Sequence, residues 1–225
     1  MKKVFLFARQ KIFNLLDKIQ LRRRKKIVKK KALILKNKDF TLLSNNCNGG
    51  VISSELGVRF NSPFVNLNIN PRDYVKYLKN LDYYSKLPIK VEFTDREYPM
   101  GFLGDLTIEF IHYRTCEEAE QKWIERTKRI NTKNLFVMLT EQEDCTEELI
   151  REFNDLPFEN KVVFTYKKHE NIGCSVYLEK FKDNPRGVYM FLGFENRISA
   201  KRKFDCFDFV SWFNGEKDLS KLLLE

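Results

Sequence analysis

The stretch Ser44 to Gly50, with the sequence SNNCNGG, constrains the fold of this chain more than any other feature. It separates an apolar run, Phe40 to Leu43, from a helix-like run, Val51 to Leu56. Consecutive glycines permit positive φ angles and a close approach of the backbone to a ligand, and asparagine amides offer both donors and acceptors. A loop of this composition between a strand and a helix predicts a built site rather than a simple connection.

Cys47 is the candidate nucleophile of this loop. If a strand ends at Ser44 and a helix starts at Val51, the Cys47 thiol lies just before a helix N-terminus, where the macrodipole favours a thiolate. The alternative is a buried structural cysteine in an Asn-Gly turn, because free cysteines are among the most buried residues. Both interpretations are open at the level of sequence.

The chain has two histidines, and His112 is the candidate general base. It follows a period-two apolar stretch and is expected at the C-terminal end of a strand, where α/β folds place their sites. We therefore predict that Cys47 and His112 form a catalytic pair in one cleft. His169 stands among charged residues and is expected at the surface. The loop residues predicted to contact substrate or the base are Asn45, Asn46, Gly49 and Gly50.

The order of elements over residues 107–165 is strand, helix, strand, helix, strand. This order predicts an α/β fold with a central, mostly parallel sheet flanked by helices. Thr115 and Glu118 form a capping box that opens the first of these helices. On that helix Arg126 and Arg129 share a face, and we predict that they hold a phosphate of the substrate, because guanidinium groups suit phosphate. The alternative is a solvated basic face.

Charge is distributed unevenly along the chain. Of 41 Lys and Arg residues, 15 fall in residues 1–38, which contain the single acid Asp17. Residues 39–225 therefore carry more acids than bases, and no nucleic-acid partner is expected, since a basic face on the fold itself would be its signature. The predicted division is an N-terminal basic arm, 1–38, and a single α/β domain, 39–225.

The N-terminal arm is predicted to lie on a membrane. Apolar residues recur at helical spacing between Phe5 and Leu21, and the basic run Arg22 to Lys31 follows. An amphipathic helix followed by a polybasic run suits the anionic cytoplasmic leaflet, so the predicted localisation is cytoplasmic and peripheral on the inner face of the membrane. The alternatives are a solvated tail and an RNA-binding arm, for which a basic run is equally suitable. The apolar segment at the start is too short for a signal peptide or a bilayer span. The residues of the apolar stripe are Phe5, Ala8, Ile12, Leu15, Leu16 and Ile19.

Five cysteines without any C-x-x-C pair form neither a zinc motif nor a disulfide framework, which predicts a reducing, cytosolic setting. The sequence contains no G-x-G-x-x-G, no P-loop and no H-E-x-x-H motif. No metal and no cofactor are therefore expected.

Several short motifs together resemble an uncharacterised bacterial family whose members are usually labelled exopolysaccharide or capsule biosynthesis proteins. The resemblance covers about residues 40–215 and is carried by SNNC with two glycines, Ser62-Pro63-Phe64, His112-Tyr113, Arg129-Ile130-Asn131 and Trp212 to Gly215. The order of the Asn-Cys, Ser-Pro-Phe, His and Arg-x-x-Arg-Ile motifs is also similar, more weakly, to predicted papain-like cysteine hydrolases. In that comparison Cys47 matches the nucleophile and His112 the base.

The arm and the resemblance together predict a transferase, glycosyl or acyl, of bacterial surface-polysaccharide biosynthesis. Its substrate would be a lipid-linked or nucleotide-activated sugar at an anionic membrane surface. One alternative is a papain-like Cys-His hydrolase or acyl-transfer enzyme, and another is a noncatalytic scaffold of the glycan-assembly machinery.

Overall fold

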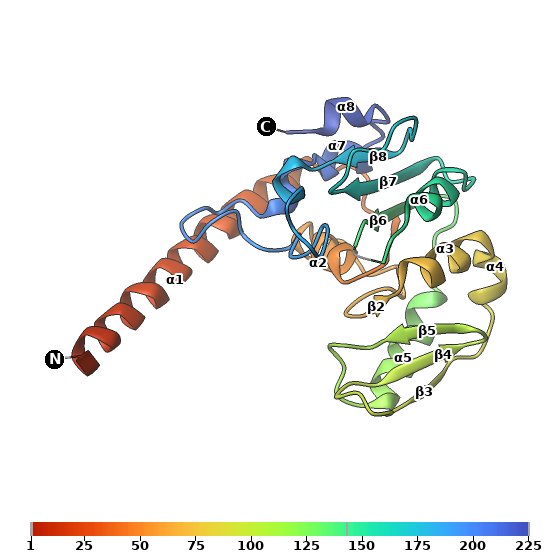
Figure 1. Cartoon of the computed structure of the whole chain (residues 1–225), viewed down its shortest axis with the longest axis horizontal. Helices are drawn as coiled ribbons and strands as arrows, with labels where there is room; N and C mark the ends of the chain where they lie inside the picture. The colour runs from red at the N-terminus through yellow and green to blue at the C-terminus, as the bar shows by residue number, and fades with distance from the viewer. Residues whose placement is uncertain (1, 143, 225) are drawn as a thin grey trace. The chain divides into compact units, whose positions relative to one another are not determined.

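The structure is a computed structural model that describes residues 2–142 and 144–224, with side chains from Phe13 onward (Figure 1). The chain forms two compact units. The sheet unit comprises residues 38–54 and 58–189, and the helical unit comprises residues 1–37, 55–57 and 190–225.

A four-stranded parallel sheet lies at the centre of the sheet unit, with the strand order β1-β6-β7-β8 (Figure 1). Thr41 pairs with Leu135 and Ser44 with Met138 in the β1–β6 register. Because each strand runs in the same direction, the loops that follow all four strands gather at one edge of the sheet. The strands are β1 (Thr41–Ser44), β6 (Leu135–Thr140), β7 (Asn160–Thr165) and β8 (Ser175–Tyr177).

A second four-stranded sheet in this unit is antiparallel, with the order β2-β5-β4-β3. Its members are β2 (Asn68–Ile69), β3 (Lys90–Glu92), β4 (Met100–Leu103) and β5 (Leu106–Glu109). The strand expected near residue 107 as part of the parallel sheet is β5, so that placement is wrong. The turn between Leu103 and Leu106 explains it, because Gly104 has a φ of 61° and joins β4 and β5 in a tight hairpin.

Helices flank both sheets, and the predicted α/β fold with a central parallel sheet is confirmed. The predicted cap at Thr115 is present, because its side chain accepts from the backbone nitrogen of Glu118. The side chains of Asn70 and Thr146 cap α3 and α6 in the same way. The helices are α2 (Asn48–Glu55), α3 (Pro71–Lys79), α4 (Leu81–Tyr84), α5 (Cys116–Thr127) and α6 (Glu147–Asn154), with a 3-10 turn η1 (Glu179–Phe181) after β8.

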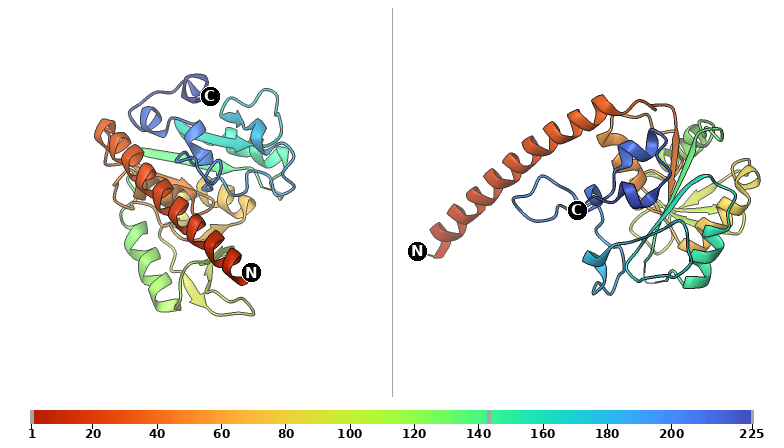
Figure 2. Two further views of the ribbon diagram at one scale, coloured as in Figure 1. Left: turned by 90° about the vertical axis from the view of Figure 1, so that its left-hand side faces the viewer. Right: turned by 90° about the horizontal axis from the view of Figure 1, so that it is seen from above.

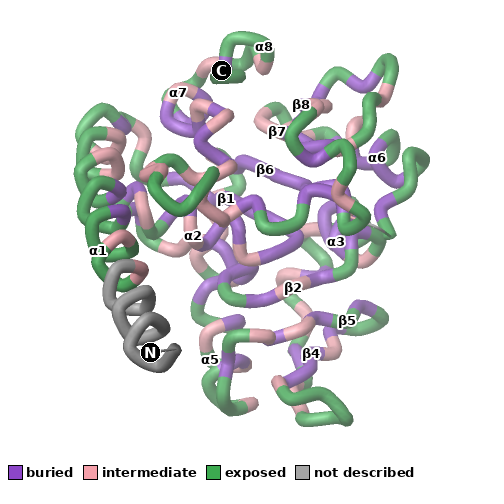
Figure 3. The backbone as a smooth tube through the Cα atoms, turned by 60° about the vertical axis from the view of Figure 1, so that its left-hand side comes forward, coloured by how far each residue is buried: buried purple, intermediate pink, exposed green. Residues whose placement is uncertain are grey.

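One apolar core fills the space between the two sheets and their helices. Alternate residues of β6 take part in it, such as Val137 and Leu139, while Phe136 and Met138 are buried on the other face. All six residues of β6 are buried, and Figure 3 shows this strand buried along its length. Burial on both faces is typical of a central parallel strand and explains the continuous apolar run in the sequence.

The helical unit is built on α1 (Lys2–Ile34), which Figure 2 shows as one continuous helix. The predicted helix and the basic run that follows it are therefore one element. The unit also contains η2 (Lys203–Cys206), α7 (Phe209–Phe213) and α8 (Leu219–Leu222). None of the helices in the described ranges is both long and apolar enough to cross a bilayer.

Buried ion pairs attach α1 to the C-terminal segment. Arg24, only 4% exposed, pairs with both Glu55 and Asp205, and the ammonium of Lys31 lies 2.7 Å from a carboxylate oxygen of Asp205. Burial acts to raise the pKa of Asp205, but the hydrogen bonds from Arg24 and Lys31 outweigh it and hold that pKa below its usual value. The basic run is thus partly used for folding.

This arrangement differs from the division predicted at residues 38 and 39, since residues 190–225 group with α1 and not with the sheets. In the apolar stripe of α1, the side chains of Leu15, Leu16 and Ile19 are exposed or half-buried. Those of Phe5, Ala8 and Ile12 lie outside the described side chains.

Candidate functional site

The loop after β1 lies at the carboxyl edge of the parallel sheet, and Asn45 is its structural centre. Its side-chain oxygen accepts from the backbone nitrogen of Thr140 at 3.1 Å, and its carbonyl oxygen accepts from the backbone nitrogen of Ile69 at 2.9 Å. Asn45 is completely buried. It therefore continues the β1–β6 pairing by one residue and ties the parallel sheet to β2.

The other predicted ligand contacts in this loop are also used internally. Asn46 donates to the hydroxyl oxygen of Thr140 at 2.7 Å and accepts from the backbone nitrogen of Asn48 at 3.0 Å. Gly49 and Gly50 are helical and have no positive φ. A Cβ atom on Gly49 would lie 3.0 Å from the Cβ of Ser44, and one on Gly50 would lie 3.1 Å from a methyl group of Val65. The glycines thus allow α2 to pack closely, and the structure gives no support for substrate contacts at these four positions.

Cys47 is half-buried and immediately precedes α2, as predicted, although the helix begins at Asn48. Burial raises the pKa of its thiol, and the opposing backbone hydrogen bond is the weaker influence. The half-buried surroundings of Cys47 therefore favour the thiol and not the thiolate that the sequence predicts.

His112 is exposed in a turn that follows β5, a strand of the antiparallel sheet, rather than at the carboxyl edge of the parallel sheet. Cys47 follows β1 in the other sheet. The catalytic pair of Cys47 and His112 therefore remains a prediction.

His169 corrects the sequence interpretation, because its side chain is 4% exposed and not at the surface. Its Nε2 atom lies 3.0 Å from a carboxylate oxygen of Glu141, and its Nδ1 atom lies 3.3 Å from one of Glu147. Glu141 directly follows β6 and also accepts from the backbone nitrogens of Tyr166 and Lys167. Sequence could have found this cluster, since residues that follow neighbouring parallel strands meet at one edge.

This edge is closed over Glu141. Gly187, with a φ of 65°, passes so near that a Cβ atom would lie 2.5 Å from the Glu141 carbonyl oxygen, and the backbone nitrogen of Val188 donates to that oxygen at 2.8 Å. Both nitrogens of His169 are occupied by carboxylates. The carboxyl edge therefore offers no free base among the residues placed there.

A cluster of three arginines, Arg59, Arg126 and Arg129, lies at the end of α5. Arg126, 8% exposed, donates from Nη1 to the hydroxyl of Tyr113 at 2.6 Å, and its guanidinium carbon lies 5.6 Å from the ring centre of Phe60. Arg126 is therefore anchored from both sides. Arg59, on the segment after α2, is exposed.

Arg129 is a member of this arginine cluster whose charge has no acidic partner among the described residues. Its Nε atom is buried and has no hydrogen-bond partner, and no ion pair to it occurs in the described part of the chain. Burial, and then the charges of Arg59 and Arg126, lower the pKa of Arg129 below its usual value, whereas Glu125 opposes this only weakly. The repulsion that Arg59 and Arg126 exert on Arg129 makes this cluster suited to an anion.

Among the described residues, no three His, Cys, Asp or Glu side chains are grouped so that they could hold a metal ion. The arrangement that can bind a ligand through charge is therefore the arginine cluster, which suits phosphate groups through fixed, forked donors.

The fold and this cluster define an α/β protein with a candidate anion-binding site. The chain belongs to the family described as domain of unknown function (DUF1919), whose model matches residues 18–214. It is also 42% identical over 182 residues to an uncharacterized protein of Haemophilus influenzae, a match that covers 80% of this chain and 86% of that relative. The matched region includes most of α1 as well as both sheets.

The raised pKa of Cys47 leads to a prediction about its reactivity. Alkylation by iodoacetamide should be slower at neutral pH than that of a free thiol such as glutathione, and it should keep accelerating above the usual thiol pKa of about 8.5. The modified fraction at Cys47 is measured by peptide mass spectrometry over a pH series. A rate that is already at its plateau near neutral pH would show a stabilised thiolate and restore the nucleophile.

Proposed function

We propose that the protein is a transferase, glycosyl or acyl, of bacterial surface-polysaccharide biosynthesis. Its substrate is a membrane-associated glycan intermediate that carries a phosphate or diphosphate group. The arginine cluster binds this group, and α1 holds the protein at the inner face of the cytoplasmic membrane. The observation that carries the proposal is the unpaired, buried Nε atom of Arg129 beside two further arginines.

An unpaired buried donor costs about 1–3 kcal/mol, and the repulsion from Arg59 and Arg126 adds to that cost. A phosphate group supplies acceptors for Nε and neutralises part of the charge. The position of Arg126, fixed by Tyr113 and Val65, leaves less conformational entropy to be lost on binding. Anchored and unbalanced arginines together thus favour binding of a polyanionic ligand.

The surface of α1 supports a membrane-bound substrate. Leu15 is 58% exposed, Ile19 is 37% exposed and Leu21 is 49% exposed. Basic side chains on the same helix are exposed further along. Apolar and basic side chains presented by one helix suit an anionic lipid surface. The exposed basic residues are Arg22, Arg23, Lys25, Lys26, Lys29 and Lys30.

The change Arg129→Ala should weaken binding of inorganic pyrophosphate by about tenfold or more, because each hydrogen bond to a charged group contributes about 1.5–3 kcal/mol. Isothermal titration calorimetry on the full chain measures the affinity. Stability without ligand should not fall, because the variant removes an unpaired, repelled cation.

Arg114→Ala is the matched control, since Arg114 is an exposed arginine of the same unit outside the cluster. It should bind pyrophosphate like the unchanged protein. Equal weakening by both changes would mean that general surface charge binds the anion, and it would remove the proposed site.

Membrane binding should depend on the exposed lysines of α1. Replacing Lys25, Lys26 and Lys29 by Gln should weaken sedimentation with phosphatidylserine vesicles by about a hundredfold, since each basic residue near the surface contributes about 1 kcal/mol. These lysines have no part in the buried ion pairs, so the fold should persist. Control replacements by Gln are made at Lys90, Lys133 and Lys182. Unchanged binding after the α1 replacements would refute the membrane assignment.

A noncatalytic scaffold is the second candidate function, and one observation favours it: the residues at the carboxyl edge are buried and bonded to one another. Composition of the surface glycan separates the two functions in strains that carry Arg129→Ala or Arg114→Ala. A transferase predicts that a glycosyl or acyl group is missing from the glycan with Arg129→Ala only. A scaffold predicts a normal repeating unit in lower amount.

A further inference from the structure

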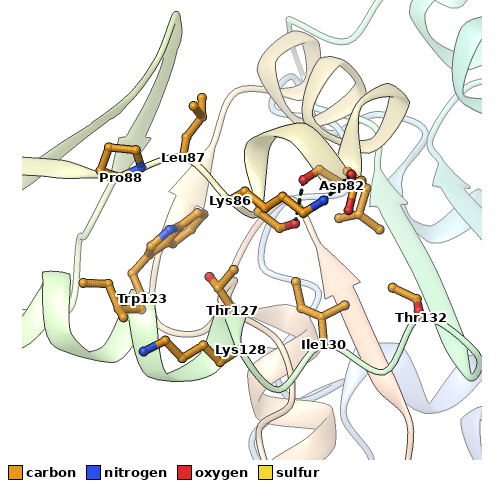
Figure 4. Close-up of a pocket in the computed structure, with 12 residues that line it drawn as sticks. Asp82, Lys86, Leu87, Pro88, Trp123, Thr127, Lys128, Ile130 and Thr132 are labelled. Carbon is orange, nitrogen blue, oxygen red and sulfur yellow. Dashed lines mark hydrogen bonds and ion pairs between the residues drawn. The ribbon is translucent and has the colours of Figure 1, made fainter.

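A cavity of the sheet unit lies between α4 and the C-terminal end of α5 and has a volume of about 560 Å³ (Figure 4). Arg126 does not line this cavity. Its side chain donates to Tyr113 and Val65 instead. The cavity is enclosed by α4, the segment that connects α4 to β3, the last turns of α5 and the segment after it. Its volume falls within the range of small-molecule sites, which is about 300–1,000 Å³.

Four aliphatic side chains line the cavity, together with Pro88 and Trp123. Leu81 and Leu87 contribute from one side, and Ile124 and Ile130 contribute from the other. Ile124 is 41% exposed, although it is a large apolar residue on a helix that carries many charges. Figure 4 shows Thr127 and Ile130 directed toward the segment that carries Leu87. An aliphatic chain is the ligand portion that such walls bind.

The polar side chains at the cavity are those of Asp82, Ser85, Lys86, Thr127, Lys128 and Thr132. Lys86 lies 2.6 Å from a carboxylate oxygen of Asp82, so those two charges balance each other. The hydroxyl of Thr127 is buried and has no hydrogen-bond partner. Lys128, the neighbour of Thr127, lies along the lower edge in Figure 4 and has no ion pair within the described ranges. Lys128 is therefore the unbalanced cation of the cavity, and Thr127 offers a buried hydroxyl donor beside it.

We propose that this cavity binds an aliphatic carboxylate. The chain packs against the four aliphatic residues, and the carboxylate accepts hydrogen bonds from the Thr127 hydroxyl and the Lys128 ammonium. A single negative charge matches the single unbalanced lysine. This site is separate from the arginine cluster and does not depend on the proposed transferase function.

A chain-length series tests the proposal on the full chain. Affinities of butanoate, hexanoate, octanoate and decanoate are measured by calorimetry below their micelle concentrations. Each added methylene should strengthen binding by about threefold to fourfold until the cavity is full, because a buried methylene contributes about 0.8 kcal/mol. Decyltrimethylammonium should bind at least tenfold more weakly than decanoate.

Two substitutions separate the head from the chain. Lys128→Glu should weaken decanoate binding at least tenfold, and Ile124→Gln should flatten the dependence on chain length. Lys133→Glu, at an exposed lysine outside the cavity, is the control for charge and should change little. Affinities that are independent of chain length, or equal effects of Lys128→Glu and Lys133→Glu, would overturn the proposal. Far-ultraviolet circular dichroism confirms that each variant is folded.

Discussion

Asn45 joins the two sheets of the sheet unit through its side chain and its backbone carbonyl. Its amide oxygen accepts from Thr140 at the end of β6, while its backbone carbonyl accepts from Ile69 in β2. A buried amide needs these partners, and leaving one unsatisfied costs about 1–3 kcal/mol. The position of α2 depends on the same loop, because Asn46 binds the backbone nitrogen of Asn48 at its start. The asparagines and glycines of this loop are thus explained by folding.

Local signals were sufficient for much of the fold. Thr115 caps its helix as predicted, because capping depends on a few neighbouring residues. Partners distant in the chain were not predictable in this way. Periodicity correctly identified the strand β5 but could not show that it pairs with β2 and β4. His169 was assigned to the surface from its charged neighbours, yet two of the residues that bury and bind it come from other segments, Glu141 and Glu147.

The candidate site shows the same limit of sequence analysis. Arg126 and Arg129 were predicted to act as a pair, but one is anchored by Tyr113 and the other is unpaired. Arg59 was not predicted, because only folding brings the segment after α2 near the end of α5. Repulsion between like charges lowers the stability of a fold. Functional sites often keep such repulsion because a bound ligand relieves it. This electrostatic cost is the reason why we propose a ligand site at the arginine cluster and not at the Cys47 loop.

Nuclear magnetic resonance of arginine side chains tests whether Arg129 binds an anion. The Nε–H signal of Arg129 is followed in the full chain while inorganic pyrophosphate is added. We expect a saturable shift at Arg129, with smaller shifts at Arg126 and Arg59 along the same binding curve, and no shift at Arg114. An Arg129 signal that stays unchanged, or that moves only as much as that of Arg114, would show that Arg129 does not bind the anion.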